Sequence, residues 1–166
     1  MVKHIEFRLA GNPDVEAIAG LVSSDAFRVD GTGAVLPLSS DEIGFLVTAQ
    51  RFHVACDANR VVGCVSTVEY GGLIELRSLV VDAGYRSRGI GHELIRLSVD
   101  KAARLGYAEL FALAGKDGLH AFTRSGFRVQ ERPPAKMARD CALCPLLDNG
   151  CNESAVVVSL LGRPAS

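Results

Sequence analysis

The sequence predicts a mixed α/β (α+β) domain in which helices flank a central, mostly antiparallel sheet. Three strand-like runs follow one another between residues 52 and 81, with short turns between them. This is the pattern of an antiparallel meander. Helical and strand-like segments alternate on both sides of the meander, so helices are available to cover the faces of the sheet.

A strand and two helices are predicted before the meander. Residues 5–10 alternate like a short strand, and residues 12–27 show helical spacing with Asn12 as the N-cap. Residues 28–40 are rich in glycine, proline and serine and predict a loop. Helical spacing resumes over residues 39–50 behind a Ser/Asp cap. Loops as long as the one between the two helices often carry function.

Strands and helices alternate after the meander. A helix with a broad apolar face is expected over residues 91–106, where it ends at a glycine. The remaining elements are a buried strand, a short helix and two further strands, over residues 108–115, 116–126, 127–132 and 154–161. The predicted order is thus one strand, two helices, three strands, a helix, a strand, a helix and two strands.

Length and composition suit a single domain spanning residues 1–166. With 166 residues, 48% of them hydrophobic, the chain can bury a core without disulfides or metal. A net charge of −1 argues against a nucleic-acid partner. Lys3, Glu6 and Arg8 interrupt any apolar signal-peptide core, and no apolar run approaches the ~20 residues of a membrane span. We therefore expect a cytoplasmic protein with no membrane partner.

A glycine-bearing turn joins the last strand of the meander to the long helix. Its sequence, RSRGIG, spans Arg86–Gly91. Backbone N–H groups at a helix N-terminus, with Arg86 and Arg88 beside them, can bind a pyrophosphate, and Gly89 permits its close approach. Neither the P-loop motif nor the Rossmann motif is present. A glycine turn of purely structural use is the alternative.

The element order and the segment LVVDAGYRSRGIG (residues 79–91) resemble the GNAT superfamily of acetyl-coenzyme A dependent N-acetyltransferases. The superfamily motif is Arg/Gln-x-x-Gly-x-Gly/Ala, and the resemblance covers essentially the whole chain. It implies a sheet splayed beside the motif strand, where backbone groups of Leu79 and Val81 would contact the pantetheine. It also implies a site for the coenzyme pyrophosphate, formed by Arg86, Ser87, Arg88, Gly89, Ile90 and Gly91.

A narrower resemblance points to short, stand-alone bacterial N-acetylglutamate synthases. It rests on four segments, residues 33–43, 74–91, 111–127 and 134–157. It implies acetyl transfer from acetyl-CoA to the α-amino group of L-glutamate, or of glutamine, as in the first step of arginine biosynthesis. The partner is then a small amino-acid substrate, the chemistry needs no metal, and a homodimer is left open.

Three residues are candidates for the acceptor site. A carboxylate is the expected general base, because an amine must lose a proton before it attacks a thioester. Glu75 stands where other superfamily members place a catalytic glutamate. Arg77 lies two residues on, hence on the same face, and can pair with a substrate carboxylate. Lys136 matches a family lysine and is a candidate for the second carboxylate. The alternatives are a solvated or sheet-edge carboxylate for Glu75, an ordinary salt bridge for Arg77 and a surface position for Lys136.

Two positions depart from the family patterns. Leu38 stands where the synthase loop has an arginine, so one expected carboxylate contact is missing. The alternatives for the function are acetylation of another amine, acetylation of an arsenic-containing amino-acid analogue as in related resistance enzymes, and a non-catalytic acyl-CoA-binding module. Phe122 replaces the tyrosine that many members use to protonate the thiolate, although a thiolate can leave without an obligatory acid. Backbone N–H groups of Val80 and Val81 would meet charge on the thioester oxygen.

Three of the five cysteines, Cys141, Cys144 and Cys151, lie within a short stretch near the C-terminus. Cys141 and Cys144 have the spacing of half a zinc site, but tetrahedral structural zinc needs a further ligand beyond the three. His120, Asp140, Asp148, Glu153, Cys56 and Cys64 are the alternatives for that ligand. A weak metal site, a reversible disulfide and reduced thiols all remain open, and the stretch serves chiefly as a family marker.

Overall fold

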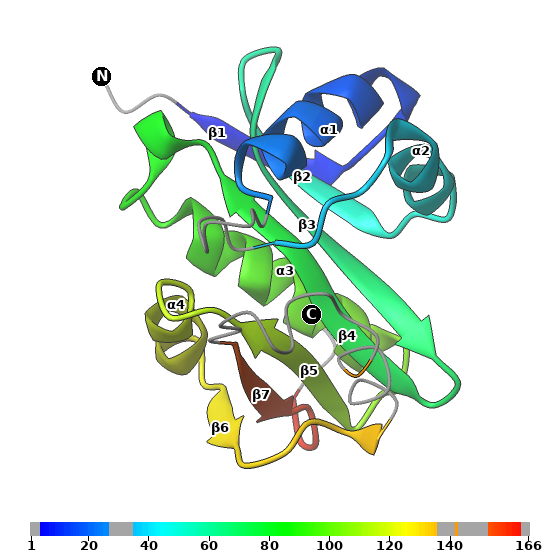
Figure 1. Ribbon diagram of the computed structural model, residues 1–166, viewed down its shortest axis with the longest axis vertical. Helices are drawn as coiled ribbons and strands as arrows, with labels where there is room; N and C mark the ends of the chain where they lie inside the picture. The colour runs from blue at the N-terminus through cyan, green and yellow to red at the C-terminus, as the bar shows by residue number, and fades with distance from the viewer. Residues whose placement is uncertain (1–3, 27–34, 136–141, 143–152, 164–166) are drawn as a thin grey trace.

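The computed structural model describes residues 4–26, 35–135, 142 and 153–163, and in this part of the chain it forms a seven-stranded sheet flanked by helices (Figure 1). The strands are β1 (Ile5–Leu9), β2 (Phe52–Asp57), β3 (Arg60–Tyr70), β4 (Leu73–Val81), β5 (Glu109–Ala114), β6 (Arg128–Gln130) and β7 (Ser154–Ser159). The helices are α1 (Val15–Ser24), α2 (Ser40–Thr48), α3 (Ile90–Arg104) and α4 (Leu119–Arg124), with 3₁₀ turns η1 (Asn12–Asp14) and η2 (Ala83–Tyr85). The predicted fold class and the predicted order of strands and α-helices are confirmed.

The sheet has the order β1-β2-β3-β4-β5-β7-β6. Strands β1 to β4 pair antiparallel in succession, as the meander predicts. Gly71 and Gly72 form the β3–β4 turn with φ of 43° and 98°, a left-handed conformation that glycine adopts without strain. The register of β3 against β4 shifts between Cys64 and Ser66, where Ser78 has φ of 52°. This bulge on β4 bends the strand beside the site described below.

The splay between β4 and β5 is the feature that creates space in the sheet. These two strands are parallel and pair at only two positions, Glu75 with Phe111 and Leu76 with Ala112. Beyond Leu76 the strands diverge (Figure 1). Strand β5 instead pairs along its whole length with β7. The predicted splay is therefore confirmed, and it leaves the C-terminal part of β4 without a strand on one side.

Two apolar clusters cover the two faces of the sheet. On one face α3 buries Leu94, Ile95 and Val99 against the strands. On the other face α1 and α2 bury side chains that include Ile18 and Ile43. Among the described helices, none is both long and apolar enough to cross a membrane.

The start of α1 differs from the prediction. Asn12 does not cap α1, because residues Asn12–Asp14 first form η1 and α1 begins at Val15. Asp14 accounts for the difference, since its carboxylate accepts two hydrogen bonds from Arg8, at 2.7 and 3.0 Å, and one from the Gly11 N–H at 2.8 Å. The Arg8 hydrogen bonds hold the pKa of Asp14 below its usual value.

A capping box fixes the start of α2 and thereby the loop that precedes it. Ser39 Oγ accepts a hydrogen bond from the Glu42 N–H at 3.2 Å, and Glu42 Oε2 accepts one from the Ser39 N–H at 2.8 Å. We expect Ser39→Ala to lower the free energy of unfolding by about 1 kcal/mol, because it removes the side-chain cap. Urea titration measures the change. Ser39→Asp, which keeps a capping carboxylate, is the control, and equal losses in the two variants would contradict the capping role.

Candidate active site

A cavity of ≈ 340 Å³ opens between the loop before α2, strands β4 and β5, and helix α4. It lies where β4 and β5 diverge. Five predicted site residues line it: Leu38, Glu75, Arg77, Leu79 and Phe122. The structure therefore brings together residues that the sequence places far apart. Most of the remaining wall is apolar, with Val35, Leu46, Val68 and Leu113 among its residues.

Glu75 and Arg77 form an ion pair at the bottom of the splay. Glu75 is 3% exposed and lies opposite Val68 on β3 and Phe111 on β5. Arg77 follows on the same face of β4, as its spacing predicts, and its Nε lies 3.2 Å from Glu75 Oε2. The guanidinium is less buried than the carboxylate, so it can pair with Glu75 and still present N–H groups to a ligand in the cavity.

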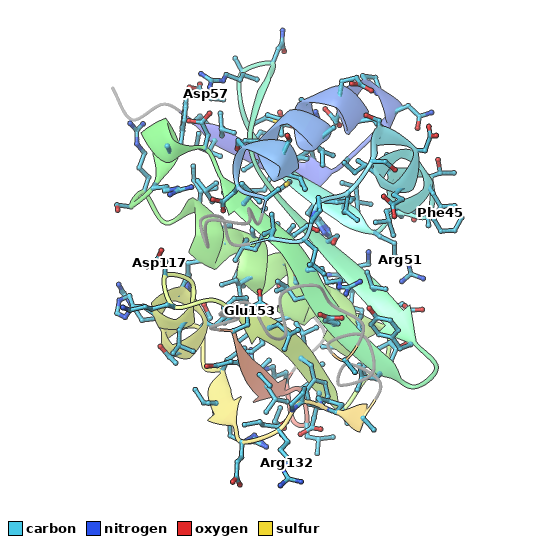
Figure 2. The ribbon with its side chains drawn as sticks, in the orientation of Figure 1. Phe45, Arg51, Asp57, Asp117, Arg132 and Glu153 are labelled. Atoms are coloured by element: carbon cyan, nitrogen blue, oxygen red, sulfur yellow. The ribbon has the colours of Figure 1, made fainter. Side chains whose placement is uncertain are left out.

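Glu153 is a cavity residue that the sequence patterns single out only as a conceivable zinc ligand. It directly precedes β7 (Figure 2). The pairing of β7 with β5 brings it to the cavity that Glu75 and Arg77 also line. Burial raises the pKa of Glu153, and the charge of Glu75 raises it further, while Arg77 acts in the opposite direction. A glutamate at the start of a strand was the only sequence signal, and it is too common to identify a site.

Phe122 forms an apolar part of the wall. It is buried on α4 and packs edge to face against Phe127, with ring centroids 5.1 Å apart. Leu38 lies in the loop capped by Ser39 and packs against the cluster under α1 and α2. The positions of both side chains are thus set by packing, and both contribute apolar surface to the cavity wall.

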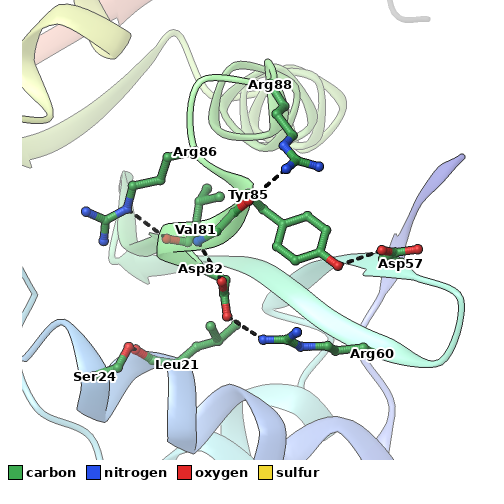
Figure 3. A network of polar contacts seen from close by, with 10 residues as sticks. Leu21, Ser24, Asp57, Arg60, Val81, Asp82, Tyr85, Arg86 and Arg88 are labelled. Atoms are coloured by element: carbon green, nitrogen blue, oxygen red, sulfur yellow. Dashed lines mark hydrogen bonds and ion pairs between the residues drawn. The ribbon is translucent and has the colours of Figure 1, made fainter. Parts of the chain in front are cut away.

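The segment between β4 and α3 is held by a network of polar contacts (Figure 3). Asp82 accepts hydrogen bonds from the Gly84 N–H at 2.9 Å and from Arg60 at 2.7 Å. Tyr85 donates its hydroxyl hydrogen to Asp57 at 2.6 Å. The Tyr85 ring also lies 5.6 Å from the guanidinium of Arg60. These contacts tie the end of β4 to the β2–β3 hairpin and so position the glycine-bearing turn.

The two arginines of this turn are both anchored through backbone carbonyls. Arg86 Nε donates to the Val81 carbonyl at 3.1 Å, and Arg88 Nη2 donates to the Gly84 carbonyl at 2.9 Å. Both guanidinium groups are exposed at the turn. They stand beside the N-terminus of α3, whose dipole also favours an anion.

The backbone of the turn directs the first N–H groups of α3 outward. Ser87 and Gly89 have φ of 61° and 80°, and Gly89 is the N-cap. A Cβ built on Gly89 would meet no atom within 4 Å, and one on Gly91 would meet only Val81 Cγ2, at 3.8 Å. The space above both glycines is therefore open. Ile90 differs, because its side chain is buried in the α3 core and only its backbone can reach a ligand.

Val81, and not Val80, directs its peptide groups to the open side of β4. The Asp82 N–H donates to the Val62 carbonyl at 2.9 Å. Gly63 and Val81 are therefore a non-hydrogen-bonded pair, in which the N–H and C=O of Val81 point away from β3. Val80 pairs with Cys64, so its peptide groups face β3. The expectation that the Val80 N–H points into the site is corrected accordingly.

The remaining predicted residues divide into two groups. Lys136, Cys141, Cys144 and Cys151 lie outside the described residues. Cys56 and Cys64 are buried free thiols in the apolar cluster under α1 and α2, and burial raises the pKa of Cys64 to about 12. Within the described ranges, no group of three or more His, Cys, Asp or Glu side chains is arranged to hold a metal ion.

Comparison with known proteins decides the family. Residues 16–127 match the model of the Acetyltransferase (GNAT) family. The chain belongs to the GNAT acetyltransferases. A curated relative, an uncharacterized N-acetyltransferase of Chlorobaculum tepidum, is 32% identical over 150 residues, which cover 89% of this chain and 91% of the relative.

Solved structures of other proteins share the fold. Rv2747 from Mycobacterium tuberculosis, in complex with CoA and NLQ, superposes with a TM-score of 0.76 at 25% identity, over 94% of this chain and 99% of that one. N-acetylglutamate synthase from Neisseria gonorrhoeae, complexed with coenzyme A and N-acetyl-glutamate, gives a TM-score of 0.77 at 23% identity. This chain spans 35% of that synthase, so the second likeness concerns the fold alone.

As a GNAT acetyltransferase, the chain uses acetyl-CoA as its co-substrate and needs no metal for the chemistry. The residues present fit this molecule. The N-terminus of α3, with Arg86 and Arg88 beside it, suits a pyrophosphate. The outward-facing N–H of Val81 suits an acceptor on an amide-bearing chain, because β5 does not pair with β4 at this position, whereas the Val81 carbonyl already accepts from Arg86 Nε. Bound acetyl-CoA supplies the activated acetyl group.

Proposed function

We propose that this GNAT acetyltransferase transfers the acetyl group to the α-amino group of an amino acid, with L-glutamate or glutamine as the preferred acceptor. The observation that carries the proposal is the ion pair of Glu75 and Arg77 inside the cavity, next to the open edge of β4. A carboxylate and a guanidinium so placed suit the ammonium and carboxylate groups of an amino acid. Such a reaction would serve as a first step of arginine biosynthesis.

Each cavity residue has a role in this proposal. Glu75 is the general base that removes a proton from the acceptor ammonium. Arg77 binds the α-carboxylate through the N–H groups that do not contact Glu75. The Val81 N–H donates to the thioester oxygen as negative charge develops there. Leu79 contacts the pantetheine, and Phe122 forms an apolar wall that excludes water from the leaving sulfur.

The coenzyme is proposed to bind along β4 and the turn after it. Arg86, Ser87, Arg88, Gly89 and the backbone of Ile90 and Gly91 would surround the pyrophosphate, with the first N–H groups of α3 pointing at it. The likeness to Rv2747, which was crystallised with CoA, supports this placement.

Leu38 favours a second class of acceptor, which has one carboxylate fewer than glutamate. An apolar side chain stands where the synthase loop has an arginine, and in the described wall of the cavity Arg77 is the one guanidinium. Glutamine, whose side chain is neutral, needs no second cation. The same argument admits other amino acids with an uncharged side chain, the arsenic-containing analogues included.

One assay tests both candidates. Acetyl-CoA is incubated with a panel of amino acids, and release of free coenzyme A thiol is followed. Thiol release with glutamate or glutamine, above the rate without acceptor, is the expected result. Tight binding of coenzyme A without thiol release for any member of the panel would overturn the proposed reaction.

Introducing the absent arginine should change the choice of acceptor. We expect Leu38→Arg to lower KM for glutamate relative to glutamine by about tenfold or more, because a charge-assisted hydrogen bond contributes about 1.5–3 kcal/mol. The ratio of kcat/KM for the two acceptors is the measurement. Leu38→Met, which keeps an apolar side chain, should leave that ratio unchanged, and an unchanged ratio in Leu38→Arg would remove residue 38 from the acceptor site.

A further inference from the structure

Glu75 has little direct contact with bulk water. It is 3% exposed and lies between two neighbouring strands. Each acetylation of an ammonium group releases one net proton, since the products are a neutral amide and a neutral thiol. A second, more exposed group in the same cavity would give this proton a path to solvent.

Glu153 is placed to be that second group. It is more exposed than Glu75 and lines the same cavity, at the point where the chain enters β7. Figure 2 labels Glu153 near the centre of the molecule, close to β5. Its position depends on the pairing of Ser154 with Ala114, which fixes the start of β7 against the end of β5.

Among the residues that the structure describes, the charged groups around Glu153 come from two elements. From β4 come Glu75 and Arg77, both electrostatically coupled to Glu153. From α2 comes Glu42, whose carboxylate is engaged by the Ser39 N–H and hydroxyl. The parts of β5 and α4 at the cavity contribute Leu113, Ala114 and Phe122, which do not titrate.

These surroundings act differently on the two carboxylates. Arg77 pairs directly with Glu75, with 3.2 Å between Nε and Oε2, and thus compensates part of the cost of burying this carboxylate. Burial and the Glu75 charge raise the pKa of Glu153 and favour its protonated form. Two carboxylates that line one cavity and differ in their exposure and in their contact with Arg77 are suited to pass a proton from one to the other.

We propose that Glu153 is the proton-relay residue of this site, taking from Glu75 the proton that the acceptor ammonium releases and passing it to solvent. This rests on the proposed acetylation of an amino group with Glu75 as base. The ammonium gives one proton to Glu75, and the resulting amine forms the N–C bond to the acetyl carbon. The C–S bond then breaks with its electron pair on sulfur, which receives the second nitrogen proton. Glu153 returns Glu75 to its ionised form.

Kinetics of Glu153→Gln with the best acceptor of the panel test the relay. We expect kcat to fall by about tenfold, with acceptor KM and coenzyme A affinity within about twofold of the original protein. The acid limb of the kcat/KM profile should move to lower pH, because the removed negative charge no longer opposes ionisation of Glu75. Glu153→Asp should recover part of kcat. Glu109→Gln, on β5 outside the cavity lining, is the matched control and should be unchanged.

Two kinetic outcomes would overturn the relay. An unchanged kcat in Glu153→Gln would show that the proton leaves by another route. A rise in acceptor KM at constant kcat would instead make Glu153 a substrate contact.

A titration that needs no acceptor separates the relay from the proposed reaction. The side-chain carboxyl of Glu153 is followed by ¹³C NMR across pH in the full chain, and again in Glu75→Gln. We expect the Glu153 midpoint to lie above that of an ordinary glutamate and to fall when Glu75 is removed. A Glu153 titration midpoint that is the same with and without Glu75→Gln would overturn the relay even if an acceptor is found. If no amino acid is acetylated but the Glu153 midpoint still depends on Glu75, only the proposed acceptor class has failed.

Discussion

Glu75→Gln is expected to lower kcat of acetyl transfer by about 10²- to 10⁴-fold and to leave coenzyme A affinity within about twofold. Glutamine keeps the size of glutamate and still offers Arg77 an amide oxygen at the position of Oε2, 3.2 Å from Nε. It cannot accept the proton of the acceptor ammonium at neutral pH. The change therefore removes the base with little disturbance to the cavity wall.

Thiol release at saturating acceptor, together with coenzyme A titration by calorimetry, measures the two effects of Glu75→Gln separately. Glu69→Gln is the matched control, because Glu69 also lies on the sheet and pairs with an arginine, Arg51, at 2.6 Å. That pair is outside the lining of the cavity. The control should lose no more than about 1 kcal/mol of stability and no activity. A near-normal kcat in Glu75→Gln would exclude Glu75 as the base.

Much of the fold follows from periodicity and turn residues. The Gly71–Gly72 turn and the two-residue alternation around it predict the meander, and the same alternation places Arg77 on the face of Glu75. Helical spacing behind Ser39 predicts α2, and the structure adds the reciprocal hydrogen bonds of the capping box. These features depend on residues close in sequence, which is why local patterns suffice.

Other features depend on pairings that local patterns do not encode. Glu153 reaches the cavity only because β7 inserts between β5 and β6. The bulge at Ser78 changes the register by one residue, and this decides which peptide groups face the open edge. The sequence motif covers both Val80 and Val81, and only the register distinguishes them. The start of α1 likewise depends on Arg8, which reaches Asp14 from β1.

Gly89→Ala is expected to weaken coenzyme A binding by about tenfold to a hundredfold, which corresponds to about 1.4–2.7 kcal/mol. Gly89 is the N-cap of α3 with φ of 80°. A methyl group there would meet no protein atom within 4 Å. It would occupy the space that a pyrophosphate needs to reach the first N–H groups of α3. The substitution also forces a left-handed conformation on alanine, at about 1–2 kcal/mol of stability.

The other end of α3 separates the strain from the loss of the ligand site. Gly106 has φ of 84°, and a Cβ there would also meet no atom within 4 Å. Gly106→Ala should therefore cost about the same stability as Gly89→Ala in urea titration, since both place alanine in the left-handed region. Only Gly89→Ala should lower coenzyme A affinity in calorimetry. Equal coenzyme A affinities in the two variants would contradict a pyrophosphate site at the N-terminus of α3. Backbone strain, which both variants share, would then account for any loss of affinity in Gly89→Ala.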